Sequence, residues 1–85
     1  MNYAAIVTSS ARKDLANLPQ AVRDRVIPAV DQLQRNPWPR GIQKLVGRGD
    51  SWRLRVGKYR VVYSVFQDSR TVKIQRVRHR REAYR

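Results

Sequence analysis

Three arginines are the side chains of this sequence whose type and spacing best fit chemistry on a phosphate. Arg53 and Arg55 alternate with apolar residues, and Arg60 follows five positions after Arg55, beyond a Gly57-Lys58 pair. Alternation with period two is typical of a strand, and the Gly-Lys pair predicts a tight hairpin turn. Same-face residues on neighbouring antiparallel strands lie about 5 Å apart, so we expect the three guanidinium groups to converge. Phosphate is the expected ligand, because the planar guanidinium group binds its oxygens in pairs.

Other basic side chains extend this cluster. If the last predicted strand ends beside the three arginines, Arg78, His79 and Arg80 join them. The candidate contacts to a bound substrate are Lys44, Lys58, Arg78 and Arg81.

The charge balance points to the same kind of ligand. The chain has 19 Lys and Arg against 6 Asp and Glu, a net charge of +13. Residues 1–51 contribute +4 (eight basic, four acidic) and residues 52–85 contribute +9 (eleven basic, two acidic). A field of this strength on so short a chain predicts a polyanionic partner, RNA or DNA.

RNA cleavage is a reaction that such a cluster could carry out without a metal. The ribose 2′-OH attacks its own phosphate when a base takes its proton, the phosphorane charge is stabilised and the leaving 5′-oxygen is protonated. Arginine suits the second task and not the first, because it stays protonated. The titratable candidates are Lys44, Lys58, His79 and Tyr84. Histidine alone among these types titrates near neutrality. Packing is the alternative role for His79, and Tyr84 either stacks on a base or seals the edge of the core.

Length and composition exclude several other kinds of site. At 85 residues the chain is expected to form one domain over 1–85, with a core too small for a large cofactor cavity. The absence of Cys excludes disulfides, thiolate zinc sites and cysteine nucleophiles. No paired carboxylates, metal-ligand cluster or triad spacing occurs, so no metal or other cofactor is expected. With no apolar run near 18 residues and no leader-like start, we expect a cytoplasmic protein without a membrane partner.

The elements that position the cluster begin with a strand and two helices. Residues 3–8 predict a short strand, followed by a helix that Ser9 or Ser10 caps and that ends at Leu18. Pro19 suits the first position of a second helix, in which Pro28 predicts a kink. The buried faces are predicted from the apolar stripes Ala11, Leu15 and Leu18 in the first helix and Val22, Val26, Val30 and Leu33 in the second.

Three strands then follow as an antiparallel meander, at 52–56, 59–66 and 71–77. The alternation slips at Arg76-Val77, which predicts a bulge or a strand end there. The predicted fold class is α+β, with the helices packed on one face of the sheet and Arg53, Arg55 and Arg60 on the other.

The sequence resembles a RelE-type toxin of the RelE/ParE superfamily, the toxin half of bacterial type II toxin–antitoxin pairs. The resemblance covers essentially the whole chain and rests on segments 11–19, 41–47, 52–63 and 77–80, together with Tyr84. It implies a RelE-like α+β fold and a ribosome-dependent endoribonuclease. Such an mRNA interferase enters the A site and cuts messenger RNA by metal-independent 2′-OH attack.

The resemblance also implies roles for individual residues. Arg53 and Arg55 would contact the base and the phosphate, and Arg60 would stabilise the transition-state charge. Arg80 would lie on the leaving-group side, and Tyr84 would stack on a base. Members of the family tend to carry Lys at the positions of Arg53 and Arg55. Either His79 therefore takes part, or these arginines only position and polarise the substrate, or activity is low.

An acidic antitoxin is the partner that the resemblance implies, with operator DNA contacted only through the toxin–antitoxin complex. The ribosome and messenger RNA are the other expected partners. Two alternatives stay open. One is a ParE-like inhibitor of DNA gyrase without nuclease activity, and the other is a non-catalytic basic RNA-binding module.

Overall fold

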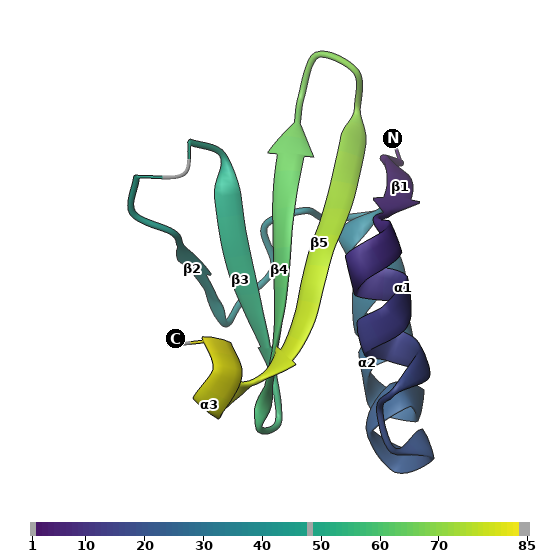
Figure 1. Cartoon of the computed structure of the whole chain (residues 1–85). Helices are drawn as coiled ribbons and strands as arrows, with labels where there is room; N and C mark the ends of the chain where they lie inside the picture. Colours follow the sequence, from purple (N-terminus) through teal and green to yellow (C-terminus); the bar gives the residue numbers. More distant parts are fainter. Residues whose placement is uncertain (1, 48, 84–85) are drawn as a thin grey trace.

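The computed structural model describes residues 2–47 and 49–83, in which two helices pack against one sheet (Figure 1). In chain order the elements are β1 (Ala4–Val7), α1 (Ser9–Ala16), α2 (Gln20–Leu33), β2 (Ile42–Lys44), β3 (Ser51–Val56), β4 (Tyr59–Phe66), β5 (Thr71–His79) and α3 (Arg80–Ala83). The first half of the chain therefore supplies the two covering helices, and the second half supplies most of the sheet.

The sheet has five strands in the order β1-β5-β4-β3-β2. Strands β2 to β5 pair antiparallel in sequence, whereas β1 lies at the far edge and pairs parallel to β5. This confirms the predicted α+β class. The meander is one strand longer than predicted, because the short β2 adds to the edge of β3.

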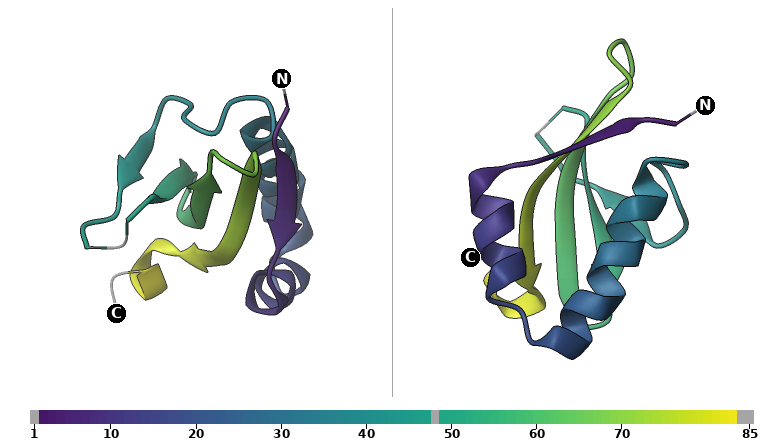
Figure 2. Two further views of the ribbon diagram at one scale, coloured as in Figure 1. Left: turned by 90° about the horizontal axis from the view of Figure 1, so that it is seen from above. Right: turned by 90° about the vertical axis from the view of Figure 1, so that its right-hand side faces the viewer.

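Both long helices lie together on one side of the sheet (Figure 2). Removing apolar surface from water stabilises this arrangement by about 1.5–3 kcal/mol for each large side chain that is fully buried. The opposite face is left uncovered by α1 and α2. The core between the two layers consists of Ala11, Leu18, Val26, Val30 and Leu33 from the helical layer and Leu54, Val61, Tyr63, Val65, Val72, Ile74 and Val77 from the strands.

Helix α1 begins one residue earlier than predicted. Thr8 is the N-cap, and its Oγ1 accepts a hydrogen bond from the backbone N–H of Ala11 at 3.1 Å. Ser9 and Ser10 are the first helical residues instead of the cap. The helix also ends earlier than Leu18, at Ala16, and Arg23 of α2 donates to carbonyl oxygens in this segment. Those hydrogen bonds satisfy acceptors that a helix end leaves open.

Helix α2 starts after Pro19, which is its N-cap rather than its first helical residue. Pro28 lies inside α2, which runs as a single element from Gln20 to Leu33. No helix in the two described ranges has both the length and the apolar character needed to span a bilayer.

A bulge interrupts the pairing of β4 with β5. Val62 pairs with Arg76, but the next residue, Tyr63, pairs with Ile74, so Gln75 is the extra residue on β5. The bulge lies one residue before the position predicted from the sequence, and β5 continues beyond it to His79. Because of the extra residue, both Ile74 and Val77 face the core although they are three positions apart.

Tyr63 ties the loop after α2 to the sheet. Its buried hydroxyl donates a hydrogen bond to the carbonyl oxygen of Pro37 at 2.6 Å. Burial raises the pKa of the Tyr63 hydroxyl well above its ordinary value, because the charged form would lose its hydration.

Candidate functional site

Three arginines stand side by side on the uncovered face of the sheet. Arg55 of β3 pairs with Arg60 of β4, and Arg60 pairs in turn with Arg78 of β5. Paired residues on antiparallel strands point to the same face, and their neighbours Leu54, Val61 and Val77 face the core. We call Arg55, Arg60 and Arg78 the arginine row. The predicted convergence of Arg55 and Arg60 is thus present, and Arg78 joins them.

Arg60 occupies the centre of the row and is the least accessible of its members. The residue is only 9% exposed, whereas Arg55 is exposed and Arg78 is half-buried. The strands β3, β4 and β5 contain no Asp or Glu, so the side chains of the row lie in a strongly positive part of the sheet. Guanidinium groups at this spacing attract anions such as phosphate.

Arg53 extends the row along β3 and lines a shallow pocket. Its guanidinium group donates to Oε1 of Gln43 on β2, the residue with which it pairs. The pocket has a volume of about 300 Å³ and is lined by Gly41, Ile42, Gln43, Arg53, Arg55 and Arg60. Gln43 and Gly41 were not predicted as site residues, because nothing in the sequence pattern indicates a strand as short as β2.

Arg80 and Arg81 follow directly after β5 and begin α3. The backbone N–H of Arg80 donates to the carbonyl oxygen of Lys58 at 2.8 Å, which holds the start of α3 against the β3–β4 turn. The side chains of Lys58, Arg80 and Arg81 are exposed. Arg55 of the row also contacts this turn, because its Nε donates to Gly57 O at 3.4 Å. Lys58, Arg80 and Arg81 therefore lie near the Arg55 end of the row.

His79 does not face the row. It pairs with Tyr59, which pairs with Val56, and these three residues form a second row on the helix-covered face. We call Val56, Tyr59 and His79 the packing row. The His79 ring meets the Tyr59 ring edge-on, with 5.2 Å between centroids. Its Nδ1 accepts a hydrogen bond from the backbone N–H of Arg81 at 3.2 Å.

Lys44 is also separated from the arginine row. It pairs with Trp52, so it shares the covered face of the sheet, and its Nζ lies 5.7 Å from the centre of the Trp52 ring. Tyr84 lies outside the described residues. The structure therefore gathers Arg53, Arg55, Arg60 and Arg78, with Lys58, Arg80 and Arg81 nearby, and places His79 and Lys44 elsewhere.

No group of three or more His, Cys, Asp or Glu side chains in the described part of the chain gathers where a metal ion could bind. The arginine row presents guanidinium groups on the uncovered face. Such groups bind phosphate oxygens and stabilise negative charge that develops on them.

A family model described as the ParE toxin of the type II toxin–antitoxin system parDE matches residues 5–84 of this chain. Toxin RelG of Mycobacterium tuberculosis is 34% identical, over 100% of this chain and 99% of the relative.

Solved structures of toxin–antitoxin complexes contain chains with a similar fold. The RelE–RelB complex of the archaeon Pyrococcus horikoshii has a chain that superimposes with a TM-score of 0.83 at 35% identity, covering 94% of this chain and 97% of that one. In the RelB–RelE antitoxin–toxin complex of Methanococcus jannaschii the TM-score is 0.77 at 28% identity, with 93% and 94% covered.

Proposed function

The chain belongs to the RelE/ParE superfamily of type II toxin–antitoxin toxins, and from this premise we propose that it is a ribosome-dependent endoribonuclease that cleaves messenger RNA in the A site. The observation that carries the proposal is the arginine row, with Arg60 nearly buried at its centre. A phosphodiester is the ligand whose geometry and charge fit three guanidinium groups on adjacent strands.

Arg60 is proposed to stabilise the charge of the transition state. When the 2′-OH attacks, negative charge develops on the non-bridging phosphate oxygens, and a donor fixed in advance stabilises it most. Arg60 meets that requirement, because its burial restricts its motion and lowers the local dielectric. Arg55 and Arg78 on either side would hold the same phosphate or its neighbour.

Arg53 and Arg55 are proposed to position and polarise the substrate. Neither side chain can accept the proton of the 2′-OH, since arginine stays protonated. The location of His79 on the covered face argues against a histidine base. Catalysis would then come from orienting the 2′-OH for in-line attack and from charge stabilisation, and these two effects together supply large accelerations.

The cations in and near α3 are proposed to contact the leaving group and the RNA backbone. Arg80 would lie on the leaving-group side, and Lys58 and Arg81 would contact the RNA backbone. Tyr84, as in the family pattern, would stack on a base.

A cognate antitoxin is the expected protein partner, because the similar solved structures are toxin–antitoxin complexes. We propose that an acidic segment of this antitoxin covers the basic face and thereby blocks RNA. Contact with operator DNA would then come from the antitoxin part of the complex.

Primer extension on a reporter message tests the proposal. Purified protein is added to a cell-free translation reaction, with naked messenger RNA as the control and the Arg60→Ala protein as the matched variant. Cuts inside A-site codons that need ribosomes and Arg60 are expected. An intact message would overturn the nuclease assignment. Because the matched family model is that of ParE, inhibition of gyrase supercoiling is then the next activity to measure.

A further inference from the structure

The bulge in β5 determines which face Arg78 occupies. With Gln75 as the extra residue, Val77 faces the core while Arg76 and Arg78 face the uncovered side. If β5 alternated regularly through Gln75 instead of bulging there, every side chain beyond Gln75 would move to the opposite face. Arg78 would then point toward the helices, and the arginine row would lose one of its three members.

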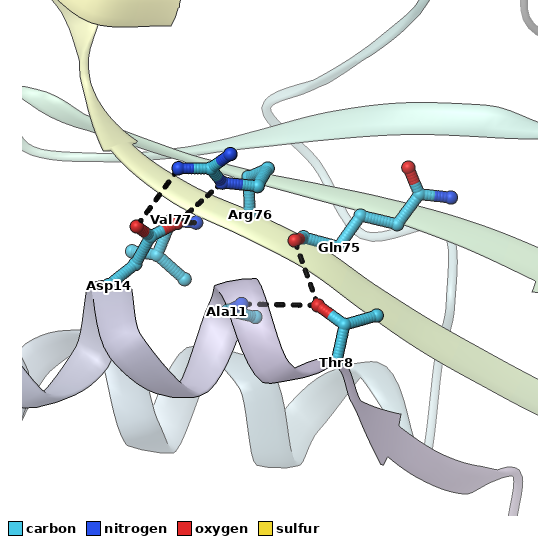
Figure 3. Close-up of polar contacts among 6 residues, drawn as sticks. All are labelled: Thr8, Ala11, Asp14, Gln75, Arg76 and Val77. Atoms are coloured by element: carbon cyan, nitrogen blue, oxygen red, sulfur yellow. Dashed lines mark hydrogen bonds and ion pairs between the residues drawn. The ribbon is translucent and has the colours of Figure 1, made fainter.

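Helix α1 holds this bulge from the edge of the sheet through Asp14 (Figure 3). Oδ2 of Asp14 accepts the backbone N–H of Val77 at 2.9 Å. The same carboxylate accepts Nε of Arg76 at 2.9 Å and its Nη2 at 3.2 Å, a two-point ion pair. The Asp14 side chain is 16% exposed and the Arg76 side chain 40%, so solvent screens the ion pair in part.

Thr8 makes the second contact between this helix and the bulge. Its Oγ1 donates to the carbonyl oxygen of Gln75 at 3.0 Å while it accepts from Ala11 N–H as the helix cap. The backbone N–H of Thr8 still belongs to the β1–β5 ladder, donating to Ile74 O at 3.1 Å. Where β1 stops, the side chains of Thr8 and of Asp14 in α1 therefore make the hydrogen bonds to the β5 edge.

We infer that Asp14 and Thr8 are positioning residues for the arginine row. They act through the Gln75 carbonyl and the Val77 amide, which they hold in the bulged register, and they do not touch the RNA themselves. The inference rests on the proposed function only in those tests that measure RNA binding or RNA cleavage.

Asp14 also governs which arginines face a substrate. Arg76 pairs with Val62 on the uncovered face, but its guanidinium group is turned to α1 by the ion pair with Asp14. A simple Asp14 variant would remove the carboxylate from this ion pair and raise the net charge by one. The test therefore removes both charges together, in Asp14→Ala/Arg76→Gln, which keeps the net charge at +13.

The first measurement is the register itself, by NMR of the full chain. Cross-strand NOEs between Arg60 and Arg78 and slow exchange of the Val77 amide are expected in the unaltered protein. Both are expected to be lost in Asp14→Ala/Arg76→Gln and weakened in Thr8→Val, whereas Thr8→Ser, which keeps the hydroxyl, restores them. The control is Asp31→Ala/Arg35→Gln, which removes one exposed acid and one exposed base near the end of α2.

The second measurement is the salt dependence of binding to a labelled oligouridine. Each lost phosphate contact lowers the slope of log K against log salt by about 0.7 for single strands. Asp14→Ala/Arg76→Gln is expected to lower the slope as much as Arg78→Ala does, and combining the two changes is expected to lower it no further. Ribosome-dependent cleavage is expected to fall roughly 10²-fold, as for a misplaced catalytic group.

Retention of the Arg60–Arg78 NOEs without Asp14 would overturn the inference, because the register would then hold by itself. Independent, additive effects of the Asp14 and Arg78 changes on the slope would overturn it as well. If the unaltered protein cleaves no RNA, the proposed function fails, but the NMR measurement still decides the inference.

Discussion

Two rows of side chains cross the same three strands one residue apart, and they differ in almost every other respect. The arginine row faces away from α1 and α2 and concentrates positive charge. The packing row faces α1 and α2. It consists of the paired residues Val56, Tyr59 and His79, and the Tyr59 and His79 rings meet edge-on. The pleat of the sheet alone separates them. A titratable side chain that is adjacent in sequence to one of these arginines can therefore lie on the opposite face of the sheet and take no part in their chemistry.

Among substitutions that test this difference between the two rows, the largest loss of cleavage is expected at Arg60. Arg60→Ala is expected to lower single-turnover, ribosome-dependent cleavage by about 10²–10³, the usual loss when one preorganised donor to a developing oxyanion is removed. Tyr59→Phe, one residue away on the packing row, is the matched control and is expected to cleave normally. Equal losses of cleavage in Arg60→Ala and Tyr59→Phe would mean that residues on both faces of the sheet take part in the reaction.

The salt response of ribosome binding is the next largest effect. Three phosphate contacts at a slope of about 0.7 each predict that affinity falls roughly 20-fold between 50 and 200 mM salt. Lys44→Gln, on the covered face, is expected to leave the slope unchanged, whereas Arg55→Gln is expected to reduce it. An affinity that is independent of salt would rule out an arginine–phosphate interface.

On the covered face, substitutions are expected to change stability instead of cleavage. Tyr63→Phe leaves the Pro37 carbonyl without its partner, and we expect a loss of about 1–2 kcal/mol in the free energy of unfolding at neutral pH. Because burial raises the pKa of Tyr63, the unfolded chain ionises first as pH rises above the ordinary tyrosine value of 10.0. The stability that the Tyr63 hydroxyl contributes is thus present below that pH and lost above it.

Denaturant unfolding of both proteins between pH 7 and 11 measures this difference. The gap in stability between the unaltered protein and Tyr63→Phe is expected to shrink as pH rises past 10.0. A gap that stays constant would show that burial of this hydroxyl does not differ between the folded and unfolded chains.

The smallest effect is expected at His79. Since its ring lies on the packing row, His79→Gln is expected to leave the pH dependence of the cleavage rate unaltered. A profile that becomes flatter near neutrality in this variant would instead assign His79 a proton-transfer role and would remove the contrast between the rows.

Local sequence patterns were sufficient to predict the helix pair, the Gly57-Lys58 turn and the slip in β5. They could not predict β2, because three residues between glycine-containing loops carry no readable period. Nor could they predict that β1 pairs with β5, since that contact joins distant segments and leaves no local trace.

The candidate site divides in the same way. Arg53 and Arg55 share a face because side chains alternate along a strand. The short turn to the next strand then fixes the register that brings Arg60 to the same face, so the sequence predicts that the three meet. His79 could not be placed in this way, because its face depends on the position of the bulge and on how far β5 continues. Gln43 and Asp14 reach the site region from elements whose positions only the whole fold determines.

The parallel pairing of β1 with β5 also has a consequence for how the chain folds. Ala4 and Thr71 are 67 residues apart, and closing a loop of that length costs about 4 kcal/mol in chain entropy beyond a constant. Such nonlocal pairing slows folding. During synthesis, the N-terminal strand cannot pair with β5 until residues 71–74 have been made. The arginine row is complete only once residue 78 of 85 has been added, so nearly the whole chain is synthesised before this surface can form.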